Sequence, residues 1–381
     1  MLHRLPVVSV VIPVRNGARY LRLAVESIQA QSLRDFELII VDDGSTDGTP
    51  ELLRELAARD PRISLHRQDA RGLVSALQYA IGLSQCSILA RMDSDDIALP
   101  DRLERQLAAF EARKDLVALG GQVLRIDDQG RALGVGNYPV GSKLTKERLR
   151  LSSPICHPAA MVRASALARI GGYREAYRHA EDYDLWLRLA DIGEIDNLPS
   201  QVLEYRVHGA GTTGSYPLAQ AMNAALALVA ADARRRGLPD SALAAAKNAD
   251  DLSAALSAAG IDGAEAQRAR LAYWRVLAIN GGIAKPTVMA AFRRVLLSLA
   301  LSTCRLDERA GFVFMMLRAA MVAGVRGSKW TAAACLLLSI AVAPVHTTRE
   351  TCQYLIARVG KRRWMSHAPR LSTAVLSAVN R

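Results

Sequence analysis

Three carboxylates stand within four residues at Asp93-Ser94-Asp95-Asp96, directly after the apolar run Ser87–Met92. Carboxylates this close repel one another unless a cation or water compensates their charge. Hard oxygen ligands of this kind suit Mg²⁺ or Mn²⁺, above all when the ion also binds phosphates. The alternative is a solvated acidic turn before the helix that Pro100 opens. Because the cluster lies at the end of an expected strand, we favour the metal site.

A second acidic group, Asp42-Asp43-Gly44-Ser45, follows another apolar run, Phe36–Val41. Two adjacent carboxylates at a sheet edge serve no packing need. They would suit hydrogen-bond acceptors for a base or a ribose. A turn that caps the next helix through Asp47 explains the same residues, and the motif alone leaves both interpretations open.

Two further residue groups lie later in the chain. Glu181-Asp182 precedes an apolar, helix-like stretch, and Asp182 occupies the position of an N-cap, a role that does not exclude catalysis. His208 follows the expected strand Gln201–Val207. A single histidine at a strand end is usually structural, and a ligand role is the alternative.

The elements that must position these residues alternate in the first half of the chain. Expected strands are Val7–Val14, Phe36–Val41, Ile63–His66 and Ser87–Met92. Between them, apolar residues at three- and four-residue spacing predict helices over Tyr20–Gln31, Thr49–Arg59 and Leu73–Leu83. This order predicts an α/β fold with a mostly parallel sheet, in which ligands bind beyond the carboxyl ends of the strands.

The pattern becomes irregular from about residue 116, with glycines at 120, 121, 130, 134 and 136. It then predicts a strand over Ala159–Val162, a helix over Asp182–Ala190 and a strand over Gln201–Val207. After Tyr216 only helical patterns remain. The chain is therefore expected to divide into residues 1–215 and an all-helical region, 216–381.

Taken in order, four motifs resemble family 2 glycosyltransferases of the GT-A fold: Val10–Gly17, Val41–Thr49, Met92–Asp96 and the Glu181-Asp182 block. The resemblance covers roughly residues 7–213. It implies a Rossmann-like GT-A domain over 1–215, with a donor-binding half at 1–115 and an acceptor-binding half at 116–215.

The resemblance also implies a task for each matching residue. Asp182 would be the catalytic base, and Asp95 and His208 would lie at the metal, Mn²⁺ or Mg²⁺. Donor-binding residues would be Pro13, Val14, Asn16, Asp42, Arg71, Asp93 and Ser94. The implied reaction is an inverting transfer from a nucleotide-sugar, with a UDP-sugar as the expected donor, to a saccharide or lipid-linked saccharide in cell-surface polysaccharide assembly.

Three other classes of protein share part of these features. A processive polysaccharide synthase should carry Q-x-x-R-W soon after the base, yet Leu185 precedes Trp186. A sugar-nucleotide pyrophosphorylase opens with a Gly-rich basic loop, which Val14–Ala18 does not supply. A non-catalytic scaffold with the same fold is the remaining alternative, and the intact Asp95 and Asp182 argue against it.

The basic charge of the chain, +12 overall, is concentrated in its C-terminal region. Residues 1–220 carry 27 Lys and Arg against 28 Asp and Glu, whereas residues 221–381 carry 22 against 9. Trp330–Thr348 is uncharged, but Pro344 interrupts it, so it is a poor membrane span.

We expect this region to bind an anionic membrane surface, which places the protein in the cytoplasm, peripheral on the inner face of the plasma membrane. A packed helical subdomain with a basic outer face is the alternative. No recognised module suggests nucleic-acid binding. The five scattered cysteines fit a reducing compartment.

Overall fold

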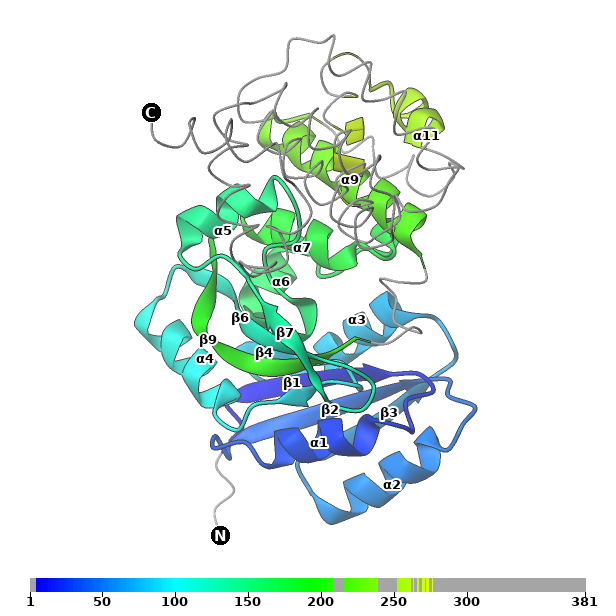
Figure 1. Cartoon of the computed structure of the whole chain (residues 1–381), viewed down its shortest axis with the longest axis vertical. Coiled ribbons are helices and arrows are strands. Elements are labelled where there is room, and N and C mark those ends of the chain that lie inside the picture. The colour runs from blue at the N-terminus through cyan, green and yellow to red at the C-terminus, as the bar shows by residue number, and fades with distance from the viewer. Residues whose placement is uncertain are drawn as a thin grey trace, which may run out of the picture. The chain divides into compact units, whose positions relative to one another are not determined.

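The computed structural model describes residues 5–207, 216–238 and 252–261, together with isolated positions as far as 276 (Figure 1). His208 and the segment Trp330–Thr348 lie outside the described residues. The predictions made for them therefore remain predictions.

Four parallel strands form the first half of the sheet: β1 (Val8–Val14), β2 (Phe36–Asp43), β3 (Ile63–Gln68) and β4 (Ile88–Arg91). Three helices connect them: α1 (Leu21–Gln29), α2 (Thr49–Arg59) and α3 (Leu73–Leu83). The spatial order is β3-β2-β1-β4, so the path reverses direction after β3. Right-handed crossovers then place α1 and α2 on one face of the sheet and α3 on the other (Figure 1).

The hydrophobic pattern explains this arrangement. Every residue of β1 is buried, as are all but one of β2, because helices cover both faces of a parallel sheet. Each helix turns one apolar side to that sheet; α1, for example, buries Leu21, Ala24, Val25 and Ile28. The expected α/β fold is confirmed.

The second half of the sheet continues from β4 as β8 (Met161–Arg163), β6 (Leu116–Ile126), β9 (Glu194–Arg206) and β5 (Ile97–Ala98), with β7 (Ala132–Gly136) paired to β6. Its pairs are antiparallel except for β6 with β9, so the whole sheet is mixed. Its helices are α4 (Arg102–Ala112), α5 (Ser142–Leu149), α6 (Ala164–Ile170) and α7 (Glu181–Leu189), with short 3₁₀ turns η1 (His157–Ala159) and η2 (Glu175–Tyr177).

The glycine-rich stretch that looked irregular is the β6–β7 hairpin. Gly120 and Gly121 lie within β6 because its neighbour β9 and the adjoining loop come too close for side chains. A Cβ on Gly120 would stand 2.3 Å from Oδ1 of Asn197, and one on Gly121 would stand 2.8 Å from the Val202 methyl groups. The strand expected over Gln201–Val207 in fact begins at Glu194, and its register against β6 shifts near Pro199.

Two helices follow the sheet, α9 (Pro217–Arg235) and α11 (Leu252–Ala258). Helix α9 packs against α7, and Nδ2 of Asn223 donates a hydrogen bond to the Arg178 carbonyl at 2.7 Å. The first compact unit accordingly extends to Ala269, beyond the expected boundary at residue 215. Within the part of the chain that the structure describes, no helix combines the length and apolar character needed to cross a membrane.

Candidate active site

The loops that follow β1, β2 and β4 meet at one edge of the sheet. The backbone N–H of Asn16 donates to Oγ of Ser45 at 2.9 Å, and the N–H of Thr46 donates to Oδ1 of Asn16 at 2.8 Å. Asn16 has a positive φ of 53°, which asparagine tolerates better than most residues. A Cβ on Gly17 would lie 3.2 Å from Oγ of Ser94. The predicted convergence of these strand ends is therefore present.

The two aspartates at the end of β2 have different surroundings. Asp43 accepts hydrogen bonds from the backbone N–H groups of Arg71 and Gly72, both at 2.8 Å, and so shapes the loop after β3. Asp42 is 2% exposed and accepts from the N–H of Ser45 at 2.9 Å. Its other oxygen forms an ion pair with Nη1 of Arg67 at 3.3 Å.

An open groove of about 610 Å³ adjoins this pair. Its lining consists of Arg67, Gln68, Asp69, Arg71, Ser75 and Tyr79. Arg71 is exposed there, whereas Pro13 and Val14 are buried within β1. Pro13 and Val14 could therefore border a ligand mainly through their backbone, while the exposed Asn16 offers its side chain.

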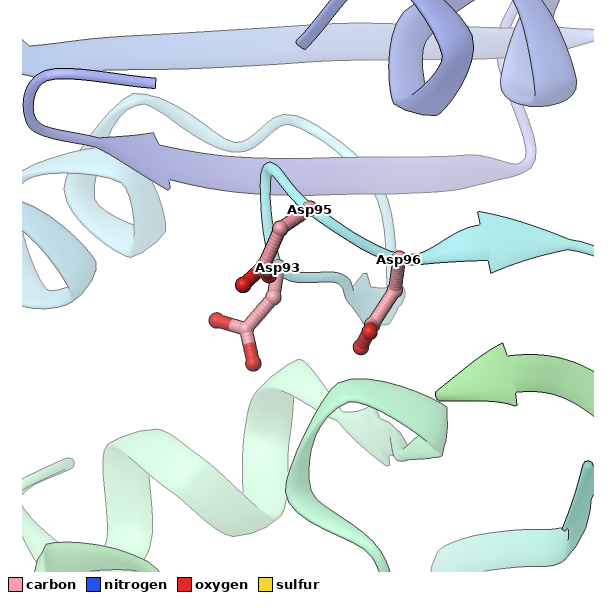
Figure 2. A group of neighbouring side chains, drawn as sticks. All are labelled: Asp93, Asp95 and Asp96. Carbon is pink, nitrogen blue, oxygen red and sulfur yellow. The ribbon is translucent and has the colours of Figure 1, made fainter. Parts of the chain in front are cut away.

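The acidic cluster after β4 lies in a single loop. Oxygens of Asp93, Asp95 and Asp96 all lie within 4.8 Å of one another. Figure 2 shows the three side chains projecting to the same side of the loop. Asp96 is 1% exposed, and its Oδ1 accepts from the N–H of Arg206 at 2.8 Å. Its Oδ2 has no hydrogen-bond partner in the described part of the chain.

The electrostatics of this cluster fit a divalent cation. Burial, together with the charges of Asp93 and Asp95, holds the pKa of Asp96 well above its usual range. A bound cation would favour the ionised carboxylates, and an all-oxygen donor set is the one that Mg²⁺ and Mn²⁺ prefer. The residues present therefore fit the metal that the sequence predicted.

Two arginines hold the acidic loop. Arg91, buried at the end of β4, donates from Nη2 to Oδ1 of Asp93 at 2.5 Å. Arg206, the last residue of β9, donates from Nε to the carbonyl of Asp95 at 2.8 Å. Sequence reasoning gave Arg206 no role, although it stands two residues before the singled-out His208.

On the opposite half of the domain, Asp182 lies in the first turn of α7. The N-cap of this helix is Ala180, so the N-cap position predicted for Asp182 is wrong by two residues. Oγ of Ser153 donates to Oδ2 of Asp182 at 3.2 Å. Burial raises the pKa of Asp182, and burial together with the Asp182 charge raises the pKa of Glu181 to about 7. A raised pKa suits a carboxylate that must accept a proton.

A third carboxylate fixes the helix that carries Asp182. Asp184 is fully buried and accepts hydrogen bonds from Nη2 of Arg188 at 2.7 Å and from Nε of Arg174 at 3.0 Å. Flanked by two guanidinium groups, Asp184 serves as a structural anchor.

Two residues that the sequence gave no reason to select, a histidine and a tyrosine, lie near Arg91. Nε2 of His157 and the hydroxyl of Tyr173 are 2.7 Å apart, and the His157 ring packs edge-on against Trp186 at 6.1 Å. Burial, with a smaller effect from the Arg91 charge, lowers the pKa of His157 well below its usual value. His157 is therefore neutral at pH 7.

Comparison with known proteins gives a consistent result. A family model described as glycosyl transferase family 2 matches residues 9–171. The chain is 34% identical over 218 residues to the O-antigen biosynthesis glycosyltransferase WbnJ of Escherichia coli, covering 56% of this chain and 85% of that protein. It is also 34% identical over 213 residues to a chondroitin synthase of Escherichia coli, of which the match spans only 30%.

Among solved structures, S. aureus TarS 1-349 in complex with UDP-GlcNAc resembles this fold with a TM-score of 0.50 and 16% sequence identity. The match covers 88% of this chain and 91% of that one. At this level of identity the likeness concerns the fold alone.

Proposed function

Because the chain belongs to glycosyl transferase family 2, we propose that it transfers a sugar from a nucleotide-sugar, preferably a UDP-sugar. The acceptor would be a saccharide or lipid-linked saccharide, and the transfer would invert the configuration at the anomeric carbon. The observation that carries this proposal is the placement of three aspartates, Asp93, Asp95 and Asp96, where the β1, β2 and β4 loops meet. The relatives named above are enzymes of O-antigen and chondroitin synthesis, which supports a role in cell-surface polysaccharide assembly.

The donor would lie along the edge formed by these loops. The base and ribose would contact the ion-paired Asp42, the groove that Arg71 lines and Asn16 at the end of β1. Asp93 and Ser94 would lie towards the diphosphate. Asp95 would hold Mn²⁺ or Mg²⁺, which neutralises charge that develops on the leaving diphosphate. His208 would join Asp95 at the metal, as the family resemblance implies.

The acceptor hydroxyl would lose its proton to Asp182. A carboxylate that accepts a proton in the transition state typically contributes ~10²–10⁴-fold in rate. Ser153 orients this carboxylate, and the anchor at Asp184 keeps α7 in place. One base and one displacement yield the inverted anomer. We further propose that the basic C-terminal region holds the enzyme at the inner face of the plasma membrane, near a lipid-linked acceptor.

The direct test is a donor screen. The full-length protein is incubated with Mn²⁺ and UDP-, GDP- or dTDP-sugars, and release of the nucleoside diphosphate is followed. We expect release from at least one UDP-sugar, stimulated by an acceptor saccharide. A protein that binds UDP yet releases none from any donor, with or without acceptors, would instead be a binding or scaffold protein.

A further inference from the structure

Arg91 is a buried cation with an incomplete set of partners. The residue is 5% exposed. Its Nη2 reaches Asp93, whereas Nε and Nη1 have no hydrogen-bond partner among the described residues. Burying a guanidinium costs free energy unless charges and hydrogen bonds compensate it. A residue retained under these conditions calls for an explanation beyond packing.

The charges around Arg91 come from both halves of the domain. Asp93 and Asp96, in the loop after β4, raise the pKa of its guanidinium against the effect of burial. From α7, Glu181 and Asp182 both lie close enough for the Arg91 charge to lower their pKa values.

Helix α7 also has two cationic partners, Arg174 and Arg188, and both pair with Asp184. His157 is neutral, and the Arg91 charge lowers the otherwise raised pKa of the Tyr173 hydroxyl. The Arg91 charge thus acts on carboxylates of both the acidic loop and α7.

The neighbouring arginine Arg102, whose Nη1 likewise has no hydrogen-bond partner among the described residues, is a structural comparison. It is fully buried and donates from Nη2 to the Arg91 carbonyl at 2.7 Å and from Nε to Oε1 of Gln106 at 3.1 Å. Its hydrogen bonds go to backbone carbonyls and to the side-chain amide of Gln106. The bond from Arg91 instead ends on a carboxylate of the acidic cluster.

We propose that Arg91 is a positioning residue for both sides of the reaction. It fixes the Asp93 carboxylate beside the donor. It also provides positive charge that acts on the acceptor-side carboxylates Glu181 and Asp182. The proposal rests on the proposed function for its second half. Its first half concerns only how Asp93 is held and can be tested by binding.

The binding test compares Arg91→Met, which removes the charge, with Arg91→Lys, which keeps it. UDP affinity is measured by calorimetry in Mn²⁺ on the full-length protein. We expect Arg91→Met to weaken UDP binding at least ~10-fold, as expected for loss of a group that orients a site carboxylate, and Arg91→Lys to restore most of it. Arg163→Met is the matched control, because Arg163 binds the carbonyls of Leu116 and Phe110. It should lower the melting temperature without changing UDP affinity.

The second test is the pH profile of nucleoside diphosphate release. The Arg91 charge lowers the pKa of Asp182, so its removal raises that pKa, and the base is then protonated up to a higher pH. The acidic limb of kcat/KM should move to higher pH in Arg91→Met and stay in place in Arg91→Lys and Arg163→Met. Normal UDP affinity together with an unmoved limb in Arg91→Met would overturn the proposal. If the wild type releases no nucleotide at all, the proposed function fails, while the binding test still decides the role of Arg91 towards Asp93.

Discussion

The aspartates of this domain perform different tasks because their partners differ. Asp184 is held by two arginines and Asp42 by Arg67, so both carboxylates are engaged in ion pairs with guanidinium groups. Asp182 accepts its side-chain hydrogen bond from the hydroxyl of Ser153 and has a raised pKa. Of these three carboxylates, Asp182 is best suited to accept a proton.

Residue type and spacing were enough to select the acidic cluster and Asp182 as candidate site residues. They were not enough to find Arg91, His157 or Tyr173 as members of the same site. These residues acquire their positions only when β4, η1 and the loop after α6 come together, and nothing in their local sequence marks that contact. The division of labour between Asp42 and Asp43 likewise depends on partners, Arg67 and the Arg71 loop, that lie more than 20 residues away.

The first prediction concerns the base. Asp182→Asn removes the proton-accepting oxygen while keeping the shape of the side chain. We expect turnover to fall at least ~10²-fold while UDP affinity stays within a few-fold of wild type, because the loss concerns the acceptor proton. Nucleotide release and calorimetry on the same preparation measure both. Near-normal turnover would transfer the role of base to another group, with Glu181 the first candidate.

The second prediction concerns pH and stability. The pKa of Glu181 is raised from 4.5 to about 7 in the folded protein, so the folded state holds a proton that the unfolded chain has already released. The free energy of unfolding therefore falls as the pH rises from about 4.5 to 7 and Glu181 is forced to ionise in the folded protein. Above about pH 7 this loss of stability is constant. Glu181→Gln should melt at a higher temperature than wild type at pH 8, and the difference should disappear near pH 4. A melting difference independent of pH would contradict this account.

At the scale of elements, the strands that position the donor loops are those whose apolar runs are continuous. Strands β1 to β4 and helices α2 and α3 lie close to their predicted limits. For β1, β2 and β4 the reason is that strands buried on both faces need an unbroken apolar run. Strand β6 was missed because Gly120 and Gly121 lower strand propensity. Glycine is needed at both positions because Asn197 and Val202 come close to them, and no local pattern reveals this approach.

Gly120→Ala tests this close approach. The added Cβ would meet Oδ1 of Asn197, a side chain already held by its hydrogen bonds to the carbonyls of Pro139 and Pro154. Overpacking of this kind costs ~1–3 kcal/mol, which calorimetric unfolding would show as a lower melting temperature. Gly82→Ala in α3 is the control: a Cβ there meets nothing within 4 Å, and alanine should stabilise the helix by ~0.5–1 kcal/mol. Equal effects of the two substitutions would disprove the packing explanation.

At the scale of the whole molecule, charge separates the catalytic part from the rest. Residues 1–220 are nearly neutral, while residues 221–381 carry 22 basic against 9 acidic residues. The proposed donor site lies among residues of the first group, so it does not account for the excess of positive charge. Helix α9 belongs structurally to the first compact unit, so the basic region does not begin at a domain boundary.

We predict that the full-length protein co-sediments with anionic vesicles and not with neutral ones. The electrostatic part of binding should weaken as salt shortens the Debye length from ~10 Å at 0.1 M to ~3 Å at 1 M. Co-sedimentation across this range measures it. Protein that stays in solution with both kinds of vesicle at low salt would favour a packed helical subdomain with a basic outer face.

The central claim, that the strand-end aspartates form a metal-dependent nucleotide site, is tested most directly by calorimetric titration of the full-length protein with UDP. We expect binding in Mn²⁺, loss of binding in excess EDTA, and at least ~10-fold weaker binding by Asp95→Asn in Mn²⁺. Equal UDP affinity with Mn²⁺ and with EDTA, unchanged by Asp95→Asn, would contradict the account.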